Sequence, residues 1–136
     1  MEPSDKTMVR FYQLLGKLFY CIAAADNTIR KEEVNQLKKI VQKEWLPLEN
    51  TFDEFGSDSG YQIEIVFDWL INNQWDIENV FFDFKIFREE HQHLFTTTIK
   101  ELILKTAEAI AKSFSGKNKS EHVLISKLIA ILQENY

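Results

Sequence analysis

Apolar residues recur along this chain at steps of three and four, the spacing of one face of an α-helix. Six stretches show this spacing, with the following inward positions: Met8, Phe11, Leu15, Leu18, Phe19 and Ile22; Val34, Leu37, Ile40 and Val41; Ile63, Val66, Phe67 and Leu70; Ile77, Val80, Phe81, Phe84 and Phe87; Ile99, Leu102, Ile103, Ile110 and Ala111; Ile125, Leu128, Ile129 and Leu132. Residues 63–67 could suit a strand, but no partner strand with turn residues follows. The pattern predicts an all-α fold of about six packed helices.

Residues that break or cap helices separate these stretches. Pro47 should end the second helix near Trp45, because proline cannot continue an α-helix. Asp76 is placed to cap the fourth helix, and residues 96–98 supply threonines for the fifth. The Gly-Lys-Asn segment 116–118 precedes a last helix from about Ser120.

The chain length suits a single compact domain over residues 1–136. No apolar run approaches the ~20 residues that span a bilayer, and the first residues do not have the layout of a signal peptide. A single cysteine, Cys21, excludes an intrachain disulfide. We therefore expect a soluble protein with no transmembrane segment.

Two segments of the chain are weakly similar to each other. Ile22-Ala23 and Ile110-Ala111 are each followed, ten positions after the alanine, by a glutamate, Glu33 and Glu121. Further on, an apolar residue in one copy matches an apolar residue in the other at two positions: Leu37 with Ile125, and Ile40 with Leu128. The repeat predicts two related helical hairpins around a pseudo-two-fold axis.

Charge is distributed unevenly along the chain. Residues 1–43 carry eight bases and five acids, residues 44–84 ten acids and no base, and residues 85–136 eight bases and six acids. The net charge of −5 argues against a nucleic-acid-binding protein. We call residues 44–84 the acidic segment. Three interpretations of this segment are open: its acids face solvent, they pair with the basic ends of the same chain, or they bind a cationic partner.

The long connection at about residues 46–60 lies within the acidic segment. It carries a Gly-Ser-Asp-Ser-Gly run at 56–60, and a loop of this length is typically functional or loosely ordered. The acids on it that we expect to bind a basic protein partner are Glu49, Asp53, Glu54 and Asp58.

The turn after the first helix holds the most informative motif. Asp26-Asn27-Thr28-Ile29 followed by Glu33 has the spacing of the second half of an EF-hand loop. A calcium loop also needs oxygen ligands four and two residues before Asp26, where Ile22 and Ala24 stand, so an EF-hand is excluded. A structural interpretation remains, in which Ile29 enters the core and Glu33 lies in the first turn of a helix.

The segment Ala-Ala-Ala-Asp-Asn-Thr-Ile-Arg-Lys-Glu-Glu at 23–33 resembles the signature of the TerB family of tellurite-resistance-associated domains. That signature has an Ala-rich helix end, an Asp-Gly turn, an Ile or Val, and a later Glu, often with a degenerate second copy. Here Asp-Gly is replaced by Asp-Asn, and the second copy has Phe114 where the first has Asp26.

The resemblance implies an all-helical, cytoplasmic bacterial domain without enzymatic activity that acts in tellurite resistance or another stress response. It also implies a divalent metal ion, for which the matching residues are Asp26 and Glu33, with Glu121 as the counterpart of Glu33. The absence of an acid at Phe114 argues against two equivalent metal sites.

Other groups of residues favour structural roles. Glu89, Glu90, His91 and His93 could supply zinc ligands, but the only other histidine is His122, so a solvated helix end is the favoured interpretation. The 90–93 segment is also a Glu-x-x-His motif, yet a second one, which di-metal bundle enzymes need, does not occur.

Two further groups leave alternatives open. We expect Cys21 to be a buried structural thiol, since catalysis would need a histidine beside it. The aromatic run 81–87 is apolar nearly all round its helix, which indicates core or, as a second choice, a homodimer interface built on Phe82 or Phe87.

These observations leave two functions. The first is a non-enzymatic TerB-like domain that binds a metal ion or a protein. The second is a structural adaptor that docks a basic partner through the acidic segment.

Overall fold

The computed structural model describes residues 5–25, 29, 31–48, 59–73, 79–112 and 119–133. Within these ranges every regular element is helical, which confirms the predicted all-α fold. The described residues form six α-helices: α1 (Asp5–Ala23), α2 (Lys31–Ile40), α3 (Gln62–Asn73), α4 (Val80–Glu90), α5 (Thr97–Lys112) and α6 (Lys119–Gln133). Among them, none combines the length and the hydropathy that a membrane span requires.

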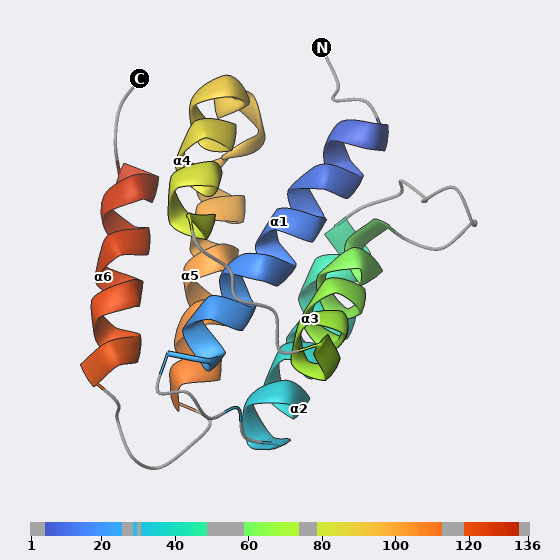
Figure 1. Cartoon of the computed structure of the whole chain (residues 1–136). Helices are drawn as coiled ribbons and strands as arrows, with labels where there is room; N and C mark the ends of the chain where they lie inside the picture. Colours follow the sequence, from blue (N-terminus) through green and yellow to red (C-terminus); the bar gives the residue numbers. More distant parts are fainter. Residues whose placement is uncertain are drawn as a thin grey trace.

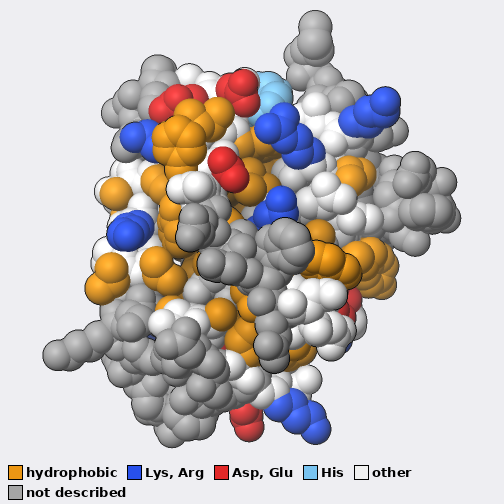
Figure 2. Space-filling model, viewed as in Figure 1, with side chains coloured by type: hydrophobic (Ala, Val, Ile, Leu, Met, Phe, Trp, Pro, Cys, Tyr) orange, Lys and Arg blue, Asp and Glu red, His pale blue; other side chains and the backbone are white. Residues whose placement is uncertain are grey.

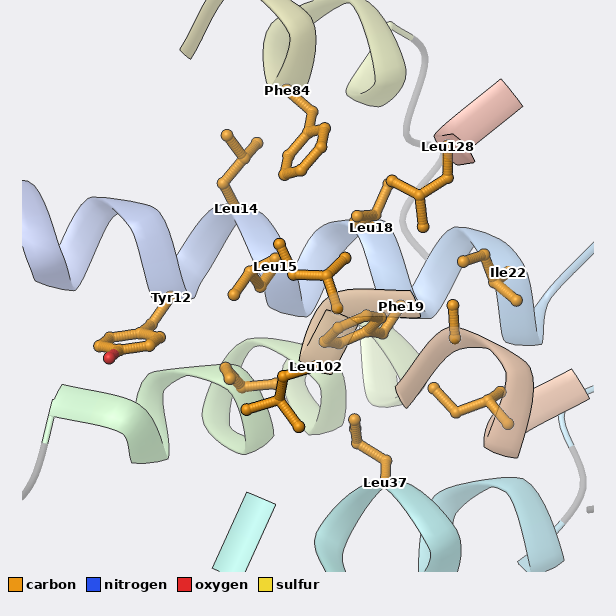
Figure 3. Close-up of a cluster of buried hydrophobic side chains, with 14 of the residues drawn as sticks. Tyr12, Leu14, Leu15, Leu18, Phe19, Ile22, Leu37, Phe84, Leu102 and Leu128 are labelled. Atoms are coloured by element: carbon orange, nitrogen blue, oxygen red, sulfur yellow. The ribbon is translucent and has the colours of Figure 1, made fainter. Parts of the chain in front are cut away.

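Helix α1 is the centre of the fold, with α3 on one side of it and α4, α5 and α6 on the other (Figure 1). Its described side chains are buried or half-buried except for one exposed basic stripe, formed by Lys6, Arg10 and Lys17. In Figure 3, Leu15, Leu18 and Phe19 of α1 lie among side chains from the surrounding helices. One core cluster includes residues of all six helices, as expected of one domain.

The inward faces were predicted well. Every inward position that the structure describes is buried or half-buried, and Leu15, Phe67 and Leu128 have no exposed surface. Of the positions named in the prediction, Ile77 lies outside the described residues.

The end of the second helix differs in detail from the prediction. The α-helix α2 ends at Ile40 and continues as a π-helical turn, η1 (Val41–Trp45), which ends at Trp45, where the helix was predicted to stop; the Leu46 N–H donates to the Val41 carbonyl. A 3₁₀ turn, η2 (Leu46–Leu48), then contains Pro47. Proline therefore coincides with a change of helix type, because it lacks the N–H that the wider helix would use.

The long connection predicted at 46–60 begins and ends in short helical turns. Besides η2, a 3₁₀ turn, η3 (Ser59–Tyr61), leads directly into α3. Residues 49–58 lie outside the described residues, and so do the four partner-binding acids predicted there.

Helix α4 begins later than predicted. Asn79, with φ 65° and ψ 15°, has the left-handed conformation, which an α-helix through this residue would not permit. Asn79 therefore precedes the first helical residue, Val80, while Asp76 lies outside the described residues.

The cap of α5 is as predicted. The Ile99 N–H donates to Thr96 Oγ1 at 3.2 Å, so Thr96 is the N-cap of this helix. Phe95, the residue before Thr96, belongs to an aromatic cluster. Its ring centroid lies 5.4 Å from that of Phe11 and 5.7 Å from that of Phe84. This cluster joins α1, α4 and the start of α5.

The two halves of the sequence repeat pack differently. Their matching apolar residues are buried in both halves: Ile22, Ile110, Leu37, Ile125, Ile40 and Leu128. However, α6 packs on α5, its own hairpin partner, whereas α2 packs chiefly on α5 rather than on α1. Helix α5 is therefore shared by both halves.

Candidate functional site

The residues that the TerB resemblance implies for metal binding are only partly described. Asp26 lies outside the described residues, and Glu121 is in the first turn of α6 with its side chain not described. Glu33 is the third residue of α2 and is 1% exposed. Its place in the first helical turn is as expected, and Ile29 beside this turn is packed against the core.

The described side chains do not form a metal centre. Within the described part of the chain, no group of three or more His, Cys, Asp or Glu side chains could hold a metal ion. Glu33 is thus the one carboxylate of the implied set whose position is defined, and a single carboxylate is too few for a divalent ion.

The residues around His91 and His93 do not share a helix face. Helix α4 ends at Glu90, and a 3₁₀ turn, η4 (Gln92–Leu94), follows His91. The His91 ring packs on the Phe87 ring, with centroids 4.4 Å apart. Glu89 and His93 therefore do not lie on one continuous α-helix, and the segment forms the end of a helix, which agrees with the interpretation favoured from the sequence.

Cys21 is half-buried rather than fully buried. It lies in the last turns of α1, at the opposite end of the molecule from the connection between α4 and α5 that carries His91 and His93 (Figure 1). Neither of these described histidines can activate the thiol as a base.

Two acids of the acidic segment form ion pairs with bases outside it. Lys105 Nζ of α5 lies 2.7 Å from Glu44 Oε2 of η1, and Lys38 Nζ of α2 lies 3.2 Å from Asp68 Oδ2 of α3. Both pairs are partly exposed, so each contributes little to stability. The acidic segment is therefore neutralised in part by the same chain.

Glu64 lies on α3 near the second of these pairs. Its Oε1 accepts a hydrogen bond from Gln42 Nε2 at 3.5 Å. The pKa of the Glu64 carboxyl is raised, and burial is the largest cause. The charge of Asp68 also raises this pKa, whereas the hydrogen bond from Gln42 and the charge of Lys38 lower it.

Large apolar side chains are exposed mainly within or beside the acidic segment. Among the described residues these side chains are Ile65, Trp69, Phe82, Ile86 and Val123, of which only Val123 is distant from the segment in sequence. Ile65 and Trp69 are one turn apart on α3, about half exposed, and Phe82 and Ile86 are one turn apart on α4. Exposed apolar pairs of this kind are typical of protein-binding surfaces.

The helical period could have identified these pairs, because Ile65 and Trp69 fall on the side of α3 opposite to Ile63 and Phe67. On α4, Phe82 is exposed, as an interface role requires. Phe87 is 1% exposed and belongs to the core, so it cannot form the dimer interface considered from the sequence.

Two open grooves run along α5. One is lined by Lys43, Glu44, Thr98, Glu101, Leu102 and Lys105, the other by Glu101, Leu104, Lys105, Glu108, Ala109 and Lys112. Two lysines and two glutamates line each groove, so neither groove presents a strong field of one sign. Neither has the enclosed apolar form of a typical small-molecule site.

Comparison of the chain with protein-family models, with curated protein sequences and with solved structures gave no match.

Proposed function

We propose that this chain is a non-catalytic, TerB-like helical domain that binds a basic protein partner through its acidic segment. One observation carries the proposal: four of the five exposed large apolar side chains of the described residues lie between residues 65 and 86, within or directly after the segment that has ten acids and no base. These apolar side chains supply contact area, and the acids beside those on α4 select a cationic partner.

The resemblance of residues 23–33 to TerB domains supplies the setting of this proposal. It supports a cytoplasmic bacterial protein that acts in tellurite resistance or another stress response. The chain also lacks a Gly-rich phosphate loop, a Gly-x-Ser-x-Gly motif and a His-Glu-x-x-His motif, which supports a role without catalysis.

Affinity capture at two salt concentrations tests the proposal. The native lysate is passed over the immobilised chain and over a variant with Glu49→Gln, Asp53→Asn, Glu54→Gln and Asp58→Asn. We expect the wild-type chain to retain basic proteins at low salt and to release them as salt rises, since screening weakens the attraction. The variant should retain less. An identical set of partners on both chains, insensitive to salt, would contradict the proposal.

A second candidate is binding of a divalent metal ion, which the resemblance implies for Asp26, Glu33 and Glu121. This candidate rests on the resemblance, and the structure adds only that Glu33 lies buried in the first turn of α2. Calorimetric titration with calcium, magnesium, zinc and manganese separates this function from the first. No heat and no thermal shift at about millimolar ion would count against it.

A further inference from the structure

The outward face of α4 combines exposed apolar side chains with acidic ones. Phe82 and Ile86 lie one turn apart on the side of the helix opposite to Phe84 and Phe87, and they are 62% and 36% exposed. A helix that is packed on one side normally carries polar residues at the centre of its outward side.

The same face is acidic. Asp83 and Glu90 are exposed, and they lie three and four residues from Ile86, which places all three on one side of the helix. Glu89 and Lys85, both half-buried, also lie on the outward half of α4. This half of the helix therefore carries three acids, Asp83, Glu89 and Glu90, and one base, Lys85. Figure 2 shows hydrophobic side chains with acidic ones beside them over the part of the molecule where α4 lies, and Lys and Arg side chains at the edges of the same area.

We infer that Phe82, Asp83, Ile86 and Glu90 form a docking surface for a basic amphipathic helix of a partner protein. The inference rests on the proposed function and specifies its surface and the chemistry of the partner. An apolar pair one turn apart matches the apolar residues at i and i+4 of an incoming helix. Lysine or arginine residues beside that stripe then meet Asp83 and Glu90.

A second copy of this chain is a poorer occupant. Two α4 faces placed together in a symmetric dimer would bring Asp83 and Glu90 of both copies close to each other, and like charges at an interface oppose association. A cationic helix instead neutralises this charge.

The outward face of α3 provides a matched control. Ile65 and Trp69 have the same spacing as Phe82 and Ile86 and are comparably exposed. The neighbouring exposed or half-exposed residues on that side are the neutral Gln62 and Asn72, and Asp68 is already paired with Lys38 at 3.2 Å. This face therefore offers apolar contact without the acidic surroundings.

The test uses the full chain and two synthetic fluorescent helical peptides with the same leucine stripe. One peptide carries lysine on both sides of the stripe, and the other carries glutamate. Fluorescence anisotropy measures affinity, and chemical-shift mapping on the ¹⁵N-labelled chain locates the contact. We expect the lysine peptide to bind, with the largest shifts at residues 82–90, and to bind less tightly as salt rises. The glutamate peptide should not bind.

Variants then separate the two faces. Phe82→Ser with Ile86→Ser should lower the affinity for the lysine peptide about tenfold or more. Asp83→Asn with Glu90→Gln should lower it too and flatten its salt dependence. Ile65→Ser with Trp69→Ser should leave it unchanged. Circular dichroism and thermal unfolding confirm that each variant is folded, as expected for exposed positions.

Several outcomes would overturn the inference. These are shifts centred on α3, an equal loss in the Ile65/Trp69 variant, no binding at millimolar peptide, or a dimer of the chain that the Phe82/Ile86 variant abolishes. The proposed function would survive any of them if salt-sensitive capture of basic proteins were still observed. It fails only by its own test.

Discussion

The indole Nε1–H of Trp45 donates a hydrogen bond of 3.0 Å to Thr106 Oγ1, across 61 residues of sequence. Both side chains are completely buried, and the Thr106 hydroxyl in turn donates to the Leu102 carbonyl at 2.8 Å. This chain of hydrogen bonds fixes η1 against α5. It also gives a hydrogen-bond partner to the indole N–H, which is the one polar group of the buried Trp45 side chain.

Thr106→Val should lower the free energy of unfolding by about 1–3 kcal/mol, because the buried indole N–H loses its acceptor while the shape of the side chain is retained. Thr106→Ser keeps the hydroxyl and is the matched control, which should lose less. Urea unfolding followed by tryptophan fluorescence measures both. Equal stability of the valine variant and the wild type would show that the hydrogen bond contributes nothing.

Gly16→Ala should destabilise the contact between α1 and α3. A Cβ atom at this position would lie 2.8 Å from the Ile63 carbonyl oxygen and 3.0 Å from Val66 Cβ. The higher helix propensity of alanine, worth about 1 kcal/mol, does not offset a clash with backbone. We expect a net loss of about 1–3 kcal/mol in the free energy of unfolding.

The neighbouring exposed substitution Lys17→Ala is the control for Gly16→Ala and should change stability by less than about 0.5 kcal/mol. A stabilising effect of Gly16→Ala in the same denaturation assay would contradict the close approach of α1 and α3 at this glycine.

Arg88 should hold the end of α6 in place. It is 4% exposed, its Nη2 donates to the Leu132 carbonyl at 2.9 Å, and its guanidinium lies over the Phe95 ring at 5.5 Å. Arg88→Met should lower the free energy of unfolding by about 1.5–3 kcal/mol, since a charged hydrogen bond is lost. Arg88→Lys should recover only part of it, because lysine lacks the planar fork.

Amide hydrogen exchange distinguishes this role of Arg88 from a general loss of packing. Relative to the wild type, we expect Arg88→Met to accelerate amide exchange more in the last turn of α6 than in the rest of the chain. Uniformly faster exchange would indicate that Arg88 serves the whole core rather than this helix end.

The raised pKa of Glu64 predicts a pH-dependent effect of Glu64→Gln. A carboxyl whose pKa is higher in the folded chain favours folding most below its unfolded pKa, about 4.3. That contribution is lost as pH rises through the folded pKa. Relative to the variant, the wild type should therefore lose stability as the pH rises from below about 4.3 toward neutrality. The midpoint of thermal unfolding at several pH values measures this, and an opposite trend would mean that Lys38 and Gln42 outweigh burial.

Core positions in both halves of the repeat should be sensitive to truncation. Leu37 has no exposed surface and Ile125 is 7% exposed. Alanine at either position should cost about 2–5 kcal/mol, because it removes buried methyl groups and leaves a cavity. Chemical denaturation measures the loss, and a cost below about 1 kcal/mol at both positions would show that these helix faces had been assigned wrongly.

The helical faces could be predicted from the sequence because each is set by local spacing alone. Leu15, Phe67 and Leu128 are apolar at the right steps, and no distant residue is needed to place them inside. The burial of Arg88 and Thr106 could not be predicted in this way. This burial depends on partners 44 and 61 residues away in the sequence. A charged or hydroxyl side chain taken alone would be predicted to lie at the surface.

The candidate site was less accessible to prediction. Charge counting identified the acidic segment, but it could not show that Glu44 and Asp68 pair with Lys105 and Lys38, because those pairs arise from tertiary contacts. The apolar pair Phe82 and Ile86 is visible in the sequence. That it faces outward follows only from which side of α4 packs on the core.

The central position of α1 has a consequence for biosynthesis. This helix leaves the ribosome before every element that covers it, and its last partners, α5 and α6, end at Lys112 and Gln133. Until those helices have emerged, Leu18 and Ile22 remain in contact with water or with a chaperone. The order of synthesis therefore delays closure of the core until nearly all of the described chain has been translated.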